Sequence, residues 1–187
     1  MCPQCYLMLP ELLRLQRLPG VEVAWHAFEM RPHPVPMPEP DGDAERRIWA
    51  KTVHPMADAR HHPMRRPVIQ PRSRLAAEAA EFARDAGRFD AMHRGLFQAY
   101  FRHGRDIGLV PVLVDVGVGA GLDGAVLRRT LERGRYTAQV LQAERRAEAL
   151  GISGVPAMVV EGPAGRQLVA GSQPYDALCR IIEVVRG

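Results

Sequence analysis

Lysine is nearly absent from this sequence: of its 25 basic residues only Lys51 is a lysine, and the others are arginines. The basic residues are scattered among 21 acidic ones, and the net charge is +4. No basic block is interleaved with aromatic residues, which make up 6% of the chain. The concentrated positive footprint of a nucleic-acid-binding protein is therefore missing. The sequence predicts a mixed-charge surface and no nucleic-acid partner.

Long apolar runs are also missing. The most apolar stretch, Leu109 to Leu122, contains Asp115 and is too short to span a bilayer. No charged segment followed by an apolar one opens the chain, so no secretory signal is visible. We therefore expect a cytoplasmic protein with no membrane partner. At 187 residues and 47% hydrophobic residues, the chain can bury a sizeable core.

Cysteine is scarce too, because three cysteines are too few for a disulfide-stapled scaffold. Two of them form the motif Cys2-Pro3-Gln4-Cys5. Proline suits the first position of a helix, which places Cys2 at the N-cap. There the unsatisfied N–H groups and the helix dipole favour a thiolate and make Cys2 a nucleophile. Cys5, one turn later, is placed to form a disulfide with Cys2.

Half of a zinc site is the alternative interpretation of this motif. A closed zinc site needs four ligands, and the remaining Cys179 has no second Cys-x-x-Cys or histidine pair nearby. The histidines at 54, 61 and 62 lack the spacing of a metal-binding motif. The sequence therefore predicts a redox pair and no metal, with Cys179 as a small buried hydrophobic residue.

The pattern along the chain is mixed. Alternation over Val21–Phe28 predicts a strand, and five prolines make Arg31–Pro40 an extended linker. Ala157–Val160 and Gln167–Ala170 read as a hairpin. Helical spacing, caps and glycine stops predict helices over Tyr6–Leu18, Ala44–Ala59, Ala76–Ala86 after Ser73, Phe89–His103, Pro111–Val118, Ala125–Arg133 after Asp123, Tyr136–Leu150 and Tyr175–Val185.

This order resembles the DsbA family, and most closely its FrnE-like branch, which also contains the 2-hydroxychromene-2-carboxylate isomerases. The resemblance implies an α/β, thioredoxin-like fold with a helical insertion: residues 1–40 and 136–187 form the thioredoxin-like domain, and residues 41–135 the insertion. The stretches that carry it are Cys2–Tyr6, Trp25–Pro32, Leu96–Phe101, Gly104–Ile107, Ala120–Asp123 and Ala149–Pro156.

The resemblance also implies a site. Cys2 is the attacking thiol and Cys5 its partner, with Pro3 and Gln4 between them. Val155–Pro156 is a cis peptide that faces the dithiol and offers its backbone to an extended substrate chain. The implied activity is thiol–disulfide exchange with a protein or a small thiol. No cofactor is implied beyond the redox-active disulfide, apart from glutathione as a ligand.

Two alternatives remain. One is a glutathione-dependent isomerase or transferase of the same fold, although the isomerases usually carry serine in place of the nucleophilic cysteine. The other is a truncated binding or chaperone-like remnant without enzymatic activity. The oligomeric state and the direction of the redox chemistry are not predicted.

One family feature is expected to be missing. Relatives carry a β-strand before the Cys-x-x-Cys, in the middle of the sheet, whereas this sequence starts one residue before Cys2. Loss of a central strand would leave backbone groups of its neighbours unpaired. We therefore expect the first central strand to be absent and hypothesise that the natural chain begins upstream of Met1.

Overall fold

The computed structural model describes residues 1–39 and 42–187 and divides them into two compact units. The hairpin unit consists of Cys2–His26 and Ala147–Gly187. The helical unit consists of Met1 and Ala27–Arg146. The predicted domain boundary between residues 40 and 41 lies outside the described residues. The predicted boundary between residues 135 and 136 remains a prediction.

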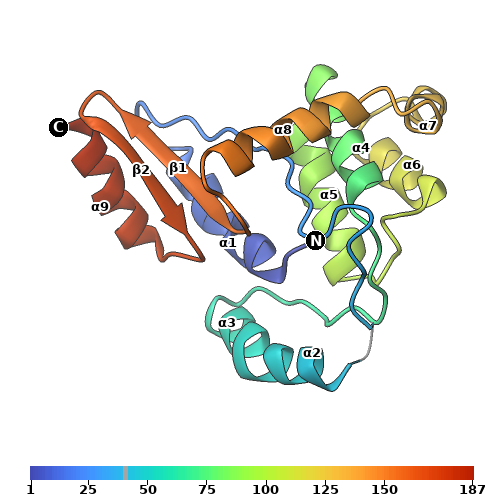
Figure 1. Ribbon diagram of the computed structural model, residues 1–187, viewed down its shortest axis with the longest axis horizontal. Coiled ribbons are helices and arrows are strands. Elements are labelled where there is room, and N and C mark those ends of the chain that lie inside the picture. Colours follow the sequence, from blue (N-terminus) through green and yellow to red (C-terminus); the bar gives the residue numbers. More distant parts are fainter. Residues whose placement is uncertain (40–41) are drawn as a thin grey trace. The chain divides into compact units, whose positions relative to one another are not determined.

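The hairpin unit pairs two strands and covers them with helices. The strands β1 (Ala157–Gly162) and β2 (Gly165–Ala170) are antiparallel, as the sequence predicts, with Met158 opposite Val169. Helix α9 (Tyr175–Arg186) lies along the hairpin (Figure 1) and contacts both strands and α1 (Pro3–Leu15). The core between these elements is apolar and contains the buried side chains of Met8, Leu15, Val169 and Leu178.

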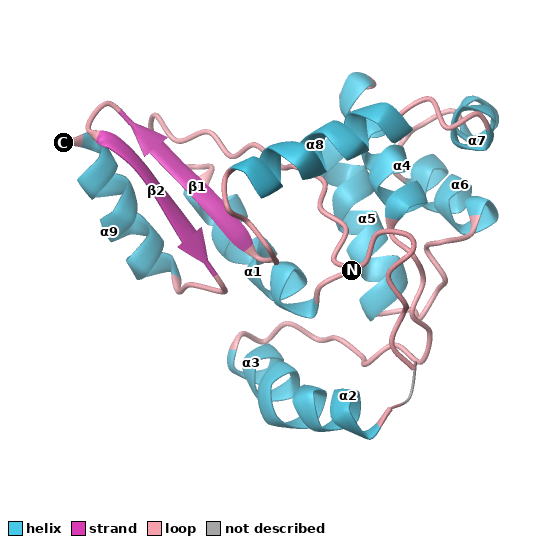
Figure 2. Ribbon diagram, in the orientation of Figure 1, coloured by secondary structure: helices cyan, strands magenta, loops and turns pink. Residues whose placement is uncertain are grey.

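The helical unit is built from helices packed in sequence order. Neighbouring pairs in this order, α4 with α5, α5 with α6 and α6 with α7, contact each other. Figure 2 shows no strand among the described residues of this unit, in agreement with the sequence. Its elements are α2 (Asp43–Ile48), the π-helical turn η1 (Trp49–Val53), α3 (His54–Ala59), α4 (Arg74–Asp85), α5 (Phe89–Phe101), α6 (Val110–Gly119), α7 (Gly124–Glu132) and α8 (Thr137–Ala149), whose last three residues belong to the hairpin unit.

Most helix ends lie within a few residues of their predicted positions. Gly87 follows α4 with a φ of 66°, a left-handed conformation that glycine adopts without strain. Asp123 caps α7, because its carboxylate accepts a hydrogen bond from the Val126 N–H at 2.9 Å. Ser73 occupies the N-cap of α4 but makes no capping hydrogen bond with its side chain.

The predicted strand over Val21–Phe28 is wrong. Its side chains do alternate, with the odd-numbered positions more buried than the even-numbered ones up to residue 26. However, these residues form no ladder with any described segment, and β1 and β2 pair with each other. Alternating burial alone does not make a strand, since a strand also needs a hydrogen-bonding neighbour. Among the described residues, no helix is long and apolar enough to cross a membrane.

Candidate active site

The Cys-x-x-Cys motif opens α1 in the way that its sequence predicts. Pro3 is the first helical residue, and Cys2 is the N-cap, with φ −101° and ψ 126°. Pro3 lacks an N–H, but the first turn of a helix leaves its N–H groups without helical partners, so nothing is lost. Gln4 and Cys5 follow within this turn and are partly exposed. Cys2 is buried, with 7% of its surface exposed.

The second part of the predicted site lies beside Cys2. The Cys2 Sγ donates to the carbonyl oxygen of Val155 at 3.5 Å, although 153 residues separate the two in the sequence. The Val155–Pro156 peptide bond is cis. Pro156 is buried and its carbonyl accepts a hydrogen bond from the Gly171 N–H at 2.8 Å. The fold of the hairpin unit therefore brings both predicted segments together.

The two thiols of the motif differ in pKa. A hydrogen bond from the Cys5 side chain is the main cause that lowers the pKa of Cys2 from 9.0 to about 7; burial opposes this shift. The backbone N–H groups of Cys5 and Gln4, in the first turn of the helix, lower the pKa of Cys2 further.

The pKa of Cys5 moves in the opposite direction. Its hydrogen bond to Cys2, its burial and the negative charge on Cys2 all raise this pKa above the ordinary value. The pair therefore loses its first proton from Cys2, which is about half ionised at pH 7, and keeps the other proton on Cys5. All three cysteines are free thiols. This is the reduced form of a dithiol whose more acidic member stands at a helix N-terminus.

Cys179 does not join this pair. It lies on α9, half-buried against the apolar core of the hairpin unit, where its sulfur and the Tyr175 hydroxyl are hydrogen-bonded. The interaction raises the pKa of Tyr175. The prediction of a small hydrophobic residue is correct for its packing, but the thiol is partly exposed.

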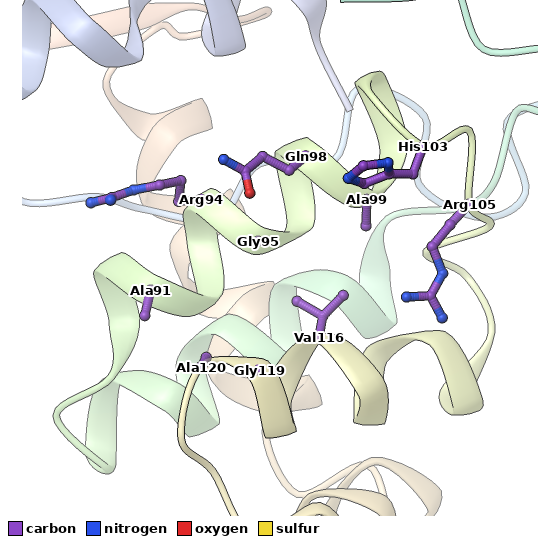
Figure 3. A pocket seen from close by; sticks show the side chains of 10 residues that line it. All are labelled: Ala91, Arg94, Gly95, Gln98, Ala99, His103, Arg105, Val116, Gly119 and Ala120. Atoms are coloured by element: carbon purple, nitrogen blue, oxygen red, sulfur yellow. The ribbon is translucent and has the colours of Figure 1, made fainter.

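A hollow of about 350 Å³ lies between α5 and α6 (Figure 3). Its floor is formed by small residues, and Arg94, Gln98, His103 and Arg105 stand around it. Arg105 is compensated by Asp115, whose carboxylate lies 2.7 Å away. None of the residues predicted for the site lines this hollow. In the described part of the chain, no three His, Cys, Asp or Glu side chains gather in a way that could hold a metal.

One cluster of charged residues in the helical unit was not predicted from the sequence. Glu29 and Glu144 are buried and face Arg74 at the start of α4. The residue spacing does not indicate this cluster, because its three members come from three separate segments. Charged residues on the buried face of α8 are the only sequence signal that could have indicated a polar partner there.

Comparisons with known proteins identify the family of this chain. The family model described as "DSBA-like thioredoxin domain" matches residues 1–183. The YwbO protein of Bacillus subtilis is 30% identical over 176 residues, which cover 89% of this chain and 88% of that protein.

Solved structures show the same fold. The structure of the probable DsbA oxidoreductase SCO1869 from Streptomyces coelicolor has a TM-score of 0.77 at 24% identity, covering 97% of this chain and 84% of that one. The cytosolic disulfide reductase DsbM from Pseudomonas aeruginosa has a TM-score of 0.70 at 22% identity, covering 97% and 93%. A second DsbM structure, with GSH, has a TM-score of 0.68 at 22% identity and covers 97% and 94%. The chain has this thioredoxin-like fold and belongs to the family of DSBA-like thioredoxin domains, whose general chemistry is thiol–disulfide exchange.

Proposed function

We propose that this protein is a thiol–disulfide oxidoreductase that works through Cys2 and Cys5. The observation that carries the proposal is the unequal pair: the pKa of Cys2 is lowered to about 7, while that of Cys5 is raised. A thiol with a pKa near the ambient pH is an efficient attacking group, because a large fraction of it, about half, is ionised while the thiolate is still nucleophilic. Cys5 stays protonated until it is needed as the second nucleophile.

The reaction proceeds by two displacements. The Cys2 thiolate attacks one sulfur of a substrate disulfide, forms a mixed disulfide and releases the other sulfur as a thiolate. Cys5 then loses its proton and attacks Cys2 Sγ, which releases the second substrate thiolate and forms the Cys2–Cys5 disulfide. Two electrons pass from the dithiol to the substrate, and oxidation of a substrate dithiol runs through the same steps in reverse.

The neighbours of the dithiol support a role in substrate binding. The Val155 carbonyl lies 3.5 Å from Cys2 Sγ, and Pro156 offers no N–H that would compete for the sulfur. An extended substrate chain could therefore run along the Val155 backbone and present its disulfide to Cys2. Pro3 and Gln4, between the two cysteines, are partly exposed and would contact the substrate next to its disulfide.

A small thiol in the cytoplasm is the partner that we favour beside protein substrates. DsbM is a cytosolic disulfide reductase, and one of its structures is a structure with GSH. Glutathione would then act as a substrate that reduces the Cys2–Cys5 disulfide, and no bound cofactor or metal would be needed. The second candidate function, a glutathione-dependent isomerase, also requires glutathione, so binding of glutathione alone does not distinguish the two.

Reduction of insulin by the chain in the presence of a thiol reductant tests the proposal. We expect the Cys2→Ser variant to fall to the uncatalysed rate, because the attacking sulfur is gone. Cys179→Ser is the matched control, since it removes a cysteine outside the pair, and it should keep wild-type activity. Cys5→Ser should accumulate the mixed disulfide, which mass spectrometry detects.

One result would contradict the oxidoreductase function: an insulin-reducing activity in Cys2→Ser equal to that of the wild type. Isomerisation of a chromene carboxylate that requires glutathione and survives the same substitution would instead favour the isomerase. Glutathione retained on the purified chain, without thiol–disulfide exchange, would point the same way.

A further inference from the structure

Three charged side chains of the helical unit gather away from the dithiol: Glu29, Arg74 and Glu144. The two carboxyl groups are buried, with 6% and 9% of their residue surfaces exposed. The Arg74 Nε donates to Glu29 Oε2 at 2.6 Å, and its Nη2 contacts the same oxygen. The same Nη2 lies 3.6 Å from Glu144 Oε2, so one guanidinium serves both carboxyl groups.

The charges of this cluster do not balance. Two ionised carboxylates and one arginine would leave a net negative charge in a buried place, which is costly. Moreover, Glu144 Oε1 is buried and makes no hydrogen bond with any of the described residues. A buried carboxylate oxygen without a donor is rare, because such groups nearly always find a partner.

A proton resolves both difficulties. We propose that Glu144 is protonated in the folded protein and donates a hydrogen bond to Glu29, so that Glu29, Arg74 and Glu144 form a neutral clasp. In this clasp Glu29 is the carboxylate paired with Arg74, and the Glu144 carboxyl serves as a donor, which an ionised group cannot do. The proton comes from solvent, and the O–H bond of Glu144 is the one covalent bond that is formed.

The electrostatics of the cluster support this arrangement. Burial is the main cause that raises the pKa of Glu144; the negative charge of Glu29 raises it as well, and Arg74 opposes both. These charged groups come from the segment before the proline-rich linker and from α4. Two further titratable groups of α4 face α8: Glu78, which accepts a hydrogen bond from the Thr137 hydroxyl at 2.7 Å, and Glu81, which accepts one from the Gln139 side-chain amide at 2.7 Å.

The position of the clasp in the chain suggests its purpose. Glu29 follows closely after Ala27, where the chain enters the helical unit, and Glu144 closely precedes Arg146, where it leaves. Arg74 is the first residue of α4. The clasp therefore fastens both the entering and the leaving segment to one helix, and its strength depends on pH.

The direction of this dependence follows from the raised pKa. Near and below the unfolded value of about 4.5, Glu144 is protonated in both the folded and the unfolded chain, so the contribution of its proton to the clasp is fully present. As pH rises through the folded pKa, the proton is lost, two buried carboxylates repel each other, and the contribution disappears. Each unit by which the pKa is raised changes the unfolding equilibrium constant by about tenfold.

Urea unfolding of the full chain at a series of pH values tests the clasp. Glu144→Gln keeps a neutral donor at this position, so its stability should not fall with Glu144 ionisation. Between pH 4.5 and about pH 8 we expect the unfolding constant of the wild type to rise relative to this variant, by about tenfold for each unit by which the folded pKa of Glu144 exceeds 4.5. Glu148→Gln, an exposed position on the same helix, is the matched control and should follow the wild type.

A second measurement needs no substitution. Carbon-detected NMR of the side-chain carboxyl groups in the wild-type chain gives the titration of Glu144 directly. We expect its midpoint above 4.5, with a coupled change in the Glu29 signal. A midpoint at or below 4.5 would overturn the proposal, as would a pH dependence of Glu144→Gln identical to that of the wild type. If Glu144→Gln fails to fold, the NMR titration decides.

Discussion

The protein contains two pairs of acidic groups, and burial acts on both in the same direction with opposite results. At the start of α1, Cys2 and Cys5 share one proton, and the pKa of the buried Cys2 is lowered to about 7. At the start of α4, Glu29 and Glu144 meet at Arg74, and the pKa of Glu144 is raised. Desolvation alone would raise the pKa of an acid in both places.

The difference lies in the donors. Cys2 faces the Cys5 thiol and two backbone N–H groups of a helix terminus, and these donors outweigh burial. Glu144 has a like charge beside it, and the Arg74 guanidinium and the Glu29 backbone N–H do not outweigh burial. A buried acid is therefore more readily ionised where several donors converge on it, and it favours its neutral form where they do not.

Removal of the guanidinium should have the largest effect on stability. Arg74→Met leaves the buried Glu29 carboxylate without its cation, and we expect a loss of about 3 kcal/mol in the free energy of unfolding at neutral pH. This is near the lower end for buried ion pairs, because the Arg74 side chain is 25% exposed. Urea unfolding measures the loss.

Arg105→Met is the matched control for this prediction. Its ion pair with Asp115 is exposed, with 37% and 65% of the side chains accessible, so we expect a loss of at most about 1 kcal/mol. Equal losses in the two variants would mean that the cluster around Arg74 is no more than another surface ion pair.

Removal of the donor to the thiolate should have the next largest effect. The Cys5 hydrogen bond is the main cause of the lowered Cys2 pKa, so Cys5→Ala should move this pKa from about 7 toward 9.0. At pH 7 we expect alkylation of Cys2 by iodoacetamide to slow about tenfold, because the loss of thiolate outweighs its gain in nucleophilicity.

The midpoint of the alkylation rate against pH gives the pKa directly, with mass spectrometry to follow the peptide that contains Cys2. Cys179→Ala serves as the control and should leave the midpoint unchanged. A midpoint that stays near 7 in Cys5→Ala would assign the acidity of Cys2 to the helix terminus alone.

The smallest effect should come from a helix cap without redox chemistry. Asp123 and Cys2 both occupy N-caps, but only Asp123 makes a capping hydrogen bond with its side chain. Asp123→Ala should therefore cost about 1 kcal/mol of stability without change in thiol–disulfide exchange. Cys2→Ala should cost less stability while removing the exchange activity. The reverse order of stabilities would show that Cys2 also supports the helix.

The elements near the dithiol were largely predictable because their signals are local. Proline after Cys2 marks the start of α1, and two short β runs separated by a turn mark the hairpin. The predicted strand over Val21–Phe28 is wrong because its signal is not enough. The alternation corresponds to alternating burial, but a strand also depends on a neighbour that the pattern of one segment cannot supply.

The π-helical turn between α2 and α3 is a second feature that the sequence does not predict, although the error is smaller. The sequence predicts one helix over Ala44–Ala59, and the chain is helical there, but Trp49–Val53 is wound more loosely. Within this turn Trp49 is buried, and its ring lies 6.1 Å from that of Phe101 on α5. A local departure of this kind accompanies packing against a distant residue, which helical periodicity does not record.

By itself the sequence determined the two segments on which the proposed chemistry rests: a Cys-x-x-Cys with proline at a helix start, and a Val-Pro about 150 residues later. These are properties of covalent order, since the N–H groups of a first helical turn always follow the N-cap. Only the tertiary structure decided that Val155 lies beside Cys2 and that Glu29 and Glu144 share Arg74. The energies of such contacts depend on burial and distance between segments far apart in the chain, and both exist only once the chain has folded.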